Sequence, residues 1–262
     1  MIVLRDLSIE EGEGKTMADE KRKVRIAAVA DIHFSRTPQE NVQSLFANIA
    51  KAADVLVLCG DLTDRGTPEE ARSLARDLNA HVKIPCVGVL GNHDYESGKQ
   101  DEVKMILREA GINILDGDAC EVQGIGFAGT KGFAGGFGKN ALQPWGEEVS
   151  KLFVHEAVTE ALKLETALAK LRTRTKIAVL HYSPCQETVN GEPVEIQPFL
   201  GSSRLEEPLN RYEVAAVFHG HAHRGQLQGS TGMKAPVYNV SMIVLQRLFP
   251  DRPSFFLLEI EP

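Results

Sequence analysis

Aspartate, asparagine and histidine recur in five short motifs along this 262-residue chain, and these residue types bind divalent metal ions in proteins. The motifs are Asp31-x-His33, Gly60-Asp61-x-x-Asp64, Gly91-Asn92-His93-Asp94, a single His181, and Gly220-His221-x-His223. One histidine after a strand is usually structural, so the evidence for a metal site is the joint placement of all five motifs. Imidazole and carboxylate together suit zinc, iron or manganese, and pairs of such ions promote hydrolysis at phosphorus. The motifs therefore indicate a hydrolytic metal centre.

Each motif directly follows an apolar run that has the length of a buried strand. These runs cover residues 24–30, 54–59, 84–90, 176–180 and 214–218. Between the first three runs, residues 38–53 and 68–81 have apolar positions at helical spacing, which predicts alternating strands and helices and hence a parallel sheet. Ligands of open α/β sheets bind beyond the carboxyl ends of the strands. We therefore expect all five motifs to meet along one rim.

The rest of the chain predicts two more helices and four more strands. The helices cover residues 101–110 and 149–172, and the strands cover residues 112–115, 120–128, 237–240 and 255–260. We expect the last two strands to close a second sheet. The glycine-rich run 129–138 is expected to be a plain surface loop, with a substrate-contacting lid as the alternative. Residues 8–23 are polar, and residues 1–22 are expected to form a flexible N-terminal segment before a single domain at 23–262.

The order of the five motifs resembles that of the calcineurin-like metallophosphoesterase superfamily. The resemblance extends from Asp31 to His223, which is most of the chain, and five ordered motifs make a specific signal. It implies an α/β fold in which two mixed β-sheets pack as a sandwich flanked by helices, in four layers α/β/β/α. It also implies a two-metal centre in which a hydroxide bound to the metals attacks phosphorus.

The resemblance assigns a role to each motif residue. By this likeness Asp31, His33 and His223 would bind the first metal, Asn92, His181 and His221 the second, and Asp61 would bridge both. His93 would stabilise or protonate the leaving oxygen, and Asp64 would orient His93 through a hydrogen bond. The ligand set accepts manganese, iron or zinc and does not choose among them.

Several residues near the motifs keep a second interpretation. Asp64 could instead cap the helix that begins near Pro68. His219 alternates with His221 and His223, and the resemblance leaves it as a packing residue or a support for the ligands. Arg65 could contact phosphate or lie exposed in its loop. We expect His81 and His155, which fall in helical segments outside every motif, to lie at the surface.

The residue types in two motifs indicate which branch of the superfamily the chain resembles. Gly60-Asp61-Leu62-Thr63-Asp64 and Gly91-Asn92-His93-Asp94 look like the class III cyclic-nucleotide phosphodiesterase and glycerophosphodiesterase branch. Protein Ser/Thr phosphatases have an arginine before G-N-H-E, whereas this chain has Leu90 and Asp94 at the corresponding positions. We therefore expect an enzyme for small phosphodiesters or phosphomonoesters, with diesters slightly favoured. A nuclease of the same superfamily and a catalytically inactive metal-binding scaffold are the alternatives.

Composition limits the partners of the chain. With 29 basic and 36 acidic residues the formal net charge is −7, which disfavours binding to nucleic acid. The four cysteines form no C-x-x-C pair, which is typical of buried thiols in a reducing compartment. No apolar run reaches the roughly 18 residues of a membrane span. We therefore expect a cytoplasmic protein with a small phosphorylated substrate and no membrane partner, and the sequence leaves its oligomeric state and protein partners open.

Overall fold

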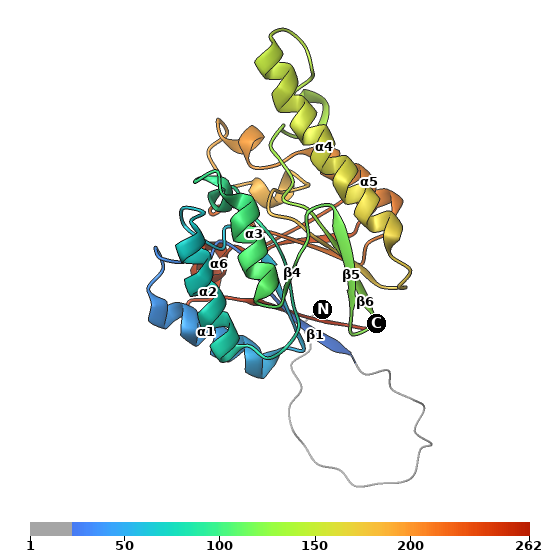
Figure 1. The fold of residues 1–262 in the computed structure, drawn as a ribbon. Coiled ribbons are helices and arrows are strands. Elements are labelled where there is room, and N and C mark those ends of the chain that lie inside the picture. Colours follow the sequence, from blue (N-terminus) through green and yellow to red (C-terminus); the bar gives the residue numbers. More distant parts are fainter. Residues whose placement is uncertain (1–22) are drawn as a thin grey trace, which may run out of the picture.

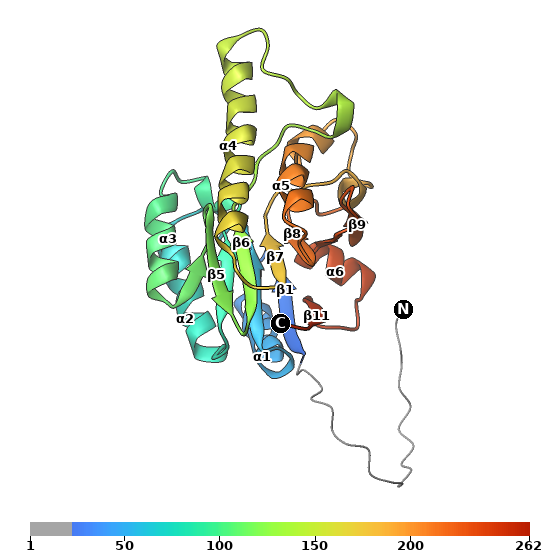
Figure 2. The ribbon, with the colours of Figure 1, turned by 90° about the vertical axis from the view of Figure 1, so that its right-hand side faces the viewer.

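Two β-sheets face each other in the centre of the molecule, and helices cover the outer face of each sheet (Figures 1 and 2). The computed structural model describes residues 23–262. The predicted flexible segment, residues 1–22, lies outside the described residues.

The first sheet has the strand order β11-β1-β2-β3-β4. Its strands are β1 (Val24–Val29), β2 (Val55–Cys59), β3 (Cys86–Val89), β4 (Ile112–Ile114) and β11 (Phe256–Ile260). Strands β1 to β4 are parallel, and β11 pairs antiparallel with β1. The helices α1 (Gln39–Ala52), α2 (Pro68–His81) and α3 (Gln100–Glu109) connect the parallel strands. The predicted helix 68–81 is confirmed; it begins after Thr67, whose hydroxyl and Glu70 form a capping box.

The second sheet has the order β5-β6-β7-β8-β10-β9. Its strands are β5 (Asp118–Val122), β6 (Ile125–Gly129), β7 (Lys176–Val179), β8 (Ala216–His219), β9 (Gln228–Ser230) and β10 (Pro236–Asn239). Strands β6, β7, β8 and β10 are parallel, and β5 and β9 pair antiparallel with their neighbours. The helices of this half are α4 (Glu148–Lys170) and α5 (Glu206–Arg211), and α6 (Met242–Leu248) follows β10.

Two expectations about strands are wrong. The segment 255–260 does not close the second sheet, because α6 returns the chain to the first sheet, where β11 covers the open edge of β1. The single strand predicted at 120–128 is a hairpin. Its turn residues Gln123 and Gly124 both have positive φ, as a tight two-residue hairpin turn requires.

The core has three layers of apolar side chains, which follow from the alternation of side chains along each strand. In β1, Ile26 and Ala28 belong to the cluster between the two sheets, whereas Ala27 and Val29 belong to the cluster under α1, α2 and α3. A third cluster lies between the second sheet and α4. This packing fixes both sheets and aligns the carboxyl ends of β1, β2, β3, β7 and β8. Among the described residues, no helix is both long and apolar enough to cross a membrane.

Candidate metal centre

The five motifs lie at the carboxyl ends of β1, β2, β3, β7 and β8, as the sequence predicts. The backbone turns sharply there. Asp31, His33, Asp61 and His221 all have φ between 43° and 70°, in the left-handed region that residues with a side chain seldom adopt. Such conformations cost free energy, and they cluster at functional sites.

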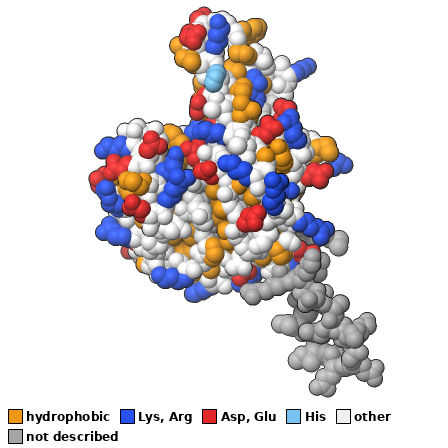
Figure 3. Space-filling view, turned by 45° about the vertical axis from the view of Figure 1, so that its right-hand side comes forward, with side chains coloured by type: hydrophobic (Ala, Val, Ile, Leu, Met, Phe, Trp, Pro, Cys, Tyr) orange, Lys and Arg blue, Asp and Glu red, His pale blue; other side chains and the backbone are white. Residues whose placement is uncertain are grey.

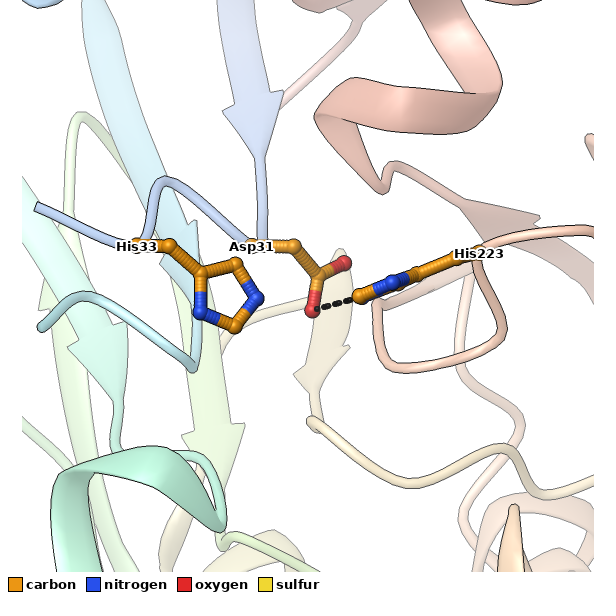
Figure 4. Close-up of side chains that lie close together, drawn as sticks. All are labelled: Asp31, His33 and His223. Carbon is orange, nitrogen blue, oxygen red and sulfur yellow. Dashed lines mark ion pairs between the residues drawn. The ribbon is translucent and has the colours of Figure 1, made fainter. Parts of the chain in front are cut away.

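Asp31, His33 and His223 form the first cluster, in which the possible ligand atoms all lie within 4.8 Å of one another (Figure 4). His223 Nε2 lies 3.3 Å from Asp31 Oδ1. Both ring nitrogens of His33 and Nε2 of His223 are buried and make no hydrogen bond; their polar contacts are carboxylate oxygens at 3.3–3.8 Å. Because a buried polar atom without a partner is costly, these nitrogens point to a ligand that supplies the missing contact.

Asp61, His181 and His221 form the second cluster, again within 4.8 Å. Asp61 lies between the clusters, since its Oδ1 is 3.4 Å from His181 Nε2 and its Oδ2 is 3.8 Å from His33 Nε2. Asn92 Oδ1 lies 2.9 Å from His181 Nε2. The structure therefore brings together all seven residues that the resemblance assigns to metal binding.

Contacts behind two histidines fix which ring nitrogen faces the cluster. The carbonyl oxygen of Cys59 accepts a hydrogen bond from His181 Nδ1 at 2.9 Å, so Nε2 is the atom directed at Asp61. The carbonyl oxygen of Phe199 accepts from His221 Nε2 at 3.3 Å, which leaves Nδ1 as the available ligand atom. Metal-binding histidines in proteins are commonly oriented in this way.

The electrostatics of the cluster favour cations. Burial would raise the pKa of Asp31, but contact with His223 and the charge of His181 lower it. Burial opposes ionisation of Asp61 as well, yet His181 lowers its pKa. Burial would lower the pKa of His181, and Asp61 raises it to about 9. Two ionised carboxylates together with imidazole nitrogens are a donor set that fits zinc, iron or manganese.

The glycines of the motifs allow the neighbouring loops of the centre to lie very close to one another. A Cβ on Gly91 would lie 2.2 Å from the backbone nitrogen of Asp61, and a Cβ on Gly60 would lie 2.5 Å from His181 Nδ1. Gly60 also has φ of +83°. Any side chain at these positions would displace a candidate ligand.

His93 lies beside the first cluster, with its ring centroid 4.5 Å from that of His33. Its backbone nitrogen donates to Asp61 Oδ1 at 2.8 Å, and its Nδ1 donates to the carbonyl oxygen of Asp64 at 2.7 Å. The expected hydrogen bond between Asp64 and His93 therefore uses the main chain of Asp64. The Asp64 carboxylate lies instead 3.4 Å from His33 Nδ1. The alternative role of Asp64 as a helix cap is wrong, because Thr67 caps α2.

Asp94 is a buried residue whose structural role the sequence did not reveal. Its carboxylate accepts hydrogen bonds from the backbone nitrogens of Leu62, Thr63 and Gly91 and from the Thr63 hydroxyl, at 2.6–3.2 Å. These bonds join the loop after β2 to the loop after β3. Burial, reinforced by the charge of Asp61, raises the pKa of Asp94 to about 6. Its position in the fourth place of G-N-H-D was the available signal.

The loop after β6 also supports the centre. Most of residues 129–136 are buried, so the surface-loop prediction is wrong for this part of the run 129–138. The carbonyl oxygen of Lys131 accepts hydrogen bonds from the backbone nitrogens of His181 and Tyr182. The Lys131 ammonium is buried and lies 4.8–5.4 Å from the ring centroids of Tyr95, Phe133 and Tyr182. Burial lowers the pKa of Lys131.

The other histidines lie outside the two clusters. His219 is fully buried and contacts the Thr188 hydroxyl and the Gly220 carbonyl oxygen, as expected of a packing or supporting residue. His155 is exposed as predicted, whereas His81 is half-buried and bonded to the carbonyl oxygen of Asp77. Arg65 is exposed in its loop.

The chain is similar to several known proteins. The sequence profile described as calcineurin-like phosphoesterase matches residues 24–225, more than half of the chain. UDP-2,3-diacylglucosamine hydrolase of Enterobacter sp. (strain 638) is 24% identical over 240 residues, which cover 81% of this chain and 87% of that protein. A 3',5'-cyclic-nucleotide phosphodiesterase of Nostoc sp. is 32% identical over 88 residues, which cover 29% of this chain and 33% of that protein.

A solved structure has the same fold. The crystal structure of phosphopantetheinyl hydrolase from Mycobacterium tuberculosis matches with a TM-score of 0.66 and 14% identity, over 91% of this chain and 96% of that one. This likeness confirms the predicted fold class of two mixed sheets with flanking helices.

Proposed function

The chain belongs to the calcineurin-like phosphoesterase family, and from this membership and the geometry of the site we propose that it is a binuclear metal-dependent hydrolase of small phosphodiesters or phosphomonoesters, with diesters favoured. One observation carries the proposal. Three buried imidazole nitrogens, on His33 and His223, have no hydrogen-bond partner and lie around two carboxylates.

The residues divide between two metal positions. Asp31, His33 and His223 would hold one ion, and Asp61 would serve both. Asn92, His181 and His221 would hold the other. When bound, manganese, iron or zinc ions would supply Lewis-acid activation of water and neutralise the charge of the phosphate.

His93 would act on the leaving group. The Asp64 carbonyl oxygen can only accept a hydrogen bond, so Nδ1 of His93 carries a proton and holds the ring in place. When the ring is cationic, with a second proton on Nε2, Nε2 would donate that proton or a hydrogen bond to the leaving oxygen, which is general acid catalysis. A binding scaffold would not need this residue, and its presence beside the cluster supports an enzyme over the inactive alternative.

The name of one relative supports a diester substrate. The similar protein that matches over 88 residues is a 3',5'-cyclic-nucleotide phosphodiesterase. The net charge of −7 supports a small phosphorylated substrate over nucleic acid. The four cysteines are free thiols, which supports a cytoplasmic protein. We also propose that residues 23–262 form a single domain.

The proposal is tested with purified, manganese-loaded protein on bis(p-nitrophenyl) phosphate and p-nitrophenyl phosphate. We expect turnover of both, faster on the diester, and loss of turnover on chelation. Asp61→Asn should abolish activity and weaken metal binding, while the exposed His155→Gln should change neither. Absence of turnover on both substrates by protein shown to contain metal would refute the proposal.

A further inference from the structure

An exposed apolar surface leads away from the candidate metal centre. It combines two segments, residues 142–152 at the start of α4 and residues 194–199. We call this surface the apolar ridge. Its members are Leu142, Trp145, Val149, Leu152, Val194, Ile196 and Phe199, each more than a third exposed.

The two segments are joined to each other and to the centre. The backbone nitrogen of Leu142 donates to the Gly135 carbonyl oxygen, and the Gly135 nitrogen donates to that of Pro198, both at 2.8 Å. The Phe199 ring lies 6.2 Å from that of Phe153, which belongs to α4. The Phe199 carbonyl oxygen accepts the bond from His221 Nε2. The ridge therefore begins at a residue that orients a candidate ligand.

The ridge continues outward along the first turns of α4. This helix has 23 residues, or roughly 34 Å at 1.5 Å per residue. Its first half projects beyond both sheets (Figures 1 and 2), and hydrophobic side chains reach the surface of this projection (Figure 3). Trp145 is 74% exposed, so no described residue covers it.

The charges along the ridge indicate what it could bind. Its two segments contain Glu147, Glu148 and Glu195 but only one basic residue, Lys151. This balance opposes a polyanion or an anionic membrane surface. Large exposed apolar surfaces often mark binding sites, and this surface begins at Phe199, which contacts the candidate ligand His221.

We propose that the apolar ridge binds a hydrocarbon chain of the substrate, so that the enzyme acts on phosphoesters that carry an alkyl or acyl chain. This inference rests on the proposed phosphoesterase activity. The phosphate would lie at the metal centre and the chain would extend past Phe199 toward Trp145. The ridge then determines substrate specificity, and the metal centre determines the reaction.

Chain-length dependence tests the proposal directly. Methyl and octyl p-nitrophenyl phosphate are compared as substrates below the micellar concentration of the octyl ester. Each buried methylene group contributes roughly fourfold, so kcat/KM should be at least about tenfold higher for the octyl ester even if burial is partial. Leu152→Gln and Trp145→Gln should reduce this preference by roughly threefold or more and leave the methyl ester unaffected.

Met105 supplies a matched control. It lies on α3 and is 52% exposed, close to the 59% of Leu152 on α4. Met105→Gln should leave the octyl preference unchanged. Equal rates on both esters, or an equal effect of the Met105 and Leu152 variants, would overturn the inference. If neither ester is hydrolysed, the proposed function itself fails.

Binding is measured without turnover through Trp145, the one tryptophan of the chain. Octyl phosphate should shift its emission to shorter wavelength, and inorganic phosphate should not. Leu152→Gln should weaken the response to octyl phosphate, whereas Met105→Gln should not. No response to octyl phosphate contradicts the proposal. A shift with phosphatidylcholine vesicles but not with octyl phosphate would make a membrane surface the occupant and would also overturn it.

Discussion

The side chains of the candidate centre are held by contacts on the side away from the metal positions. Cys59 and Phe199 do this through their carbonyl oxygens, for His181 and His221. Asp64 does the same for His93. Because all three contacts are made by the main chain, the orientation of these rings depends on where the loops lie more than on which side chains the loops carry.

At the scale of single residues, His93 should affect the reaction and not the metal. Its side chain is 32% exposed and lies outside the two clusters assigned to the metals, although its ring nitrogens lie close to possible ligand atoms of His33 and Asp64. His93→Gln should lower kcat by about 10²–10⁴, the usual contribution of a general acid, with metal content unchanged. Activity assays and elemental analysis on the same sample check this. A variant that loses its metal would show that His93 is structural.

Gly91 should be intolerant of any side chain. Gly91→Ala would place Cβ 2.2 Å from the Asp61 nitrogen, so the two loops must separate. Overpacking of this kind costs about 1–3 kcal/mol in the free energy of unfolding, and here it should also weaken metal binding. Gly232→Ala is the control, because its nearest neighbour would lie at 3.3 Å and belongs to a side chain. Urea unfolding and metal titration of both variants measure the difference.

At the scale of elements, the start of α2 is fixed independently of the centre. The capping box of Thr67 and Glu70 supplies hydrogen-bond acceptors to backbone N–H groups of the first turn of α2. It lies only three residues after Asp64. Thr67→Ala should destabilise the protein by about 1 kcal/mol, the usual contribution of such a cap. Metal affinity should be unchanged, because Asp94 holds the preceding loop. A large loss of metal binding in this variant would show that the start of α2 is not fixed independently of the metal centre.

The sequence predicted the elements that depend on local pattern and missed contacts that depend on tertiary structure. The five strands that carry motifs were found because each is a short apolar run followed by a polar residue. The place of β11 could not be found, since its partner β1 lies more than 200 residues away. The roles of Asp94 and Lys131 were missed for the same reason, because their partners belong to other loops.

At the scale of the whole molecule, the protein carries a net charge of −7 yet gathers its imidazoles around two carboxylates. Burial would lower the pKa of His181, but Asp61 raises it to about 9, so His181 is protonated at pH 7 in the absence of metal. A metal ion requires the neutral ring. Binding at pH 7 should therefore release at least about one proton, and affinity should increase as the pH rises toward 9.

Calorimetric titration in buffers of different ionisation enthalpy counts the protons released. The exposed His155→Gln variant should release the same number as the parent protein. Binding that releases no proton at pH 7, or that weakens as the pH increases from 7 to 9, would show that His181 does not take part.

The left-handed backbone at Asp31, His33, Asp61 and His221 has a consequence for engineering. Each such residue costs roughly 1–2 kcal/mol, which the packing of the two sheets must offset. Glycine at any of these positions would relieve that cost while removing a ligand. A mutant library selected for heat resistance alone should therefore accumulate glycines at these four positions, and the more stable proteins it yields would be the ones that have lost the site.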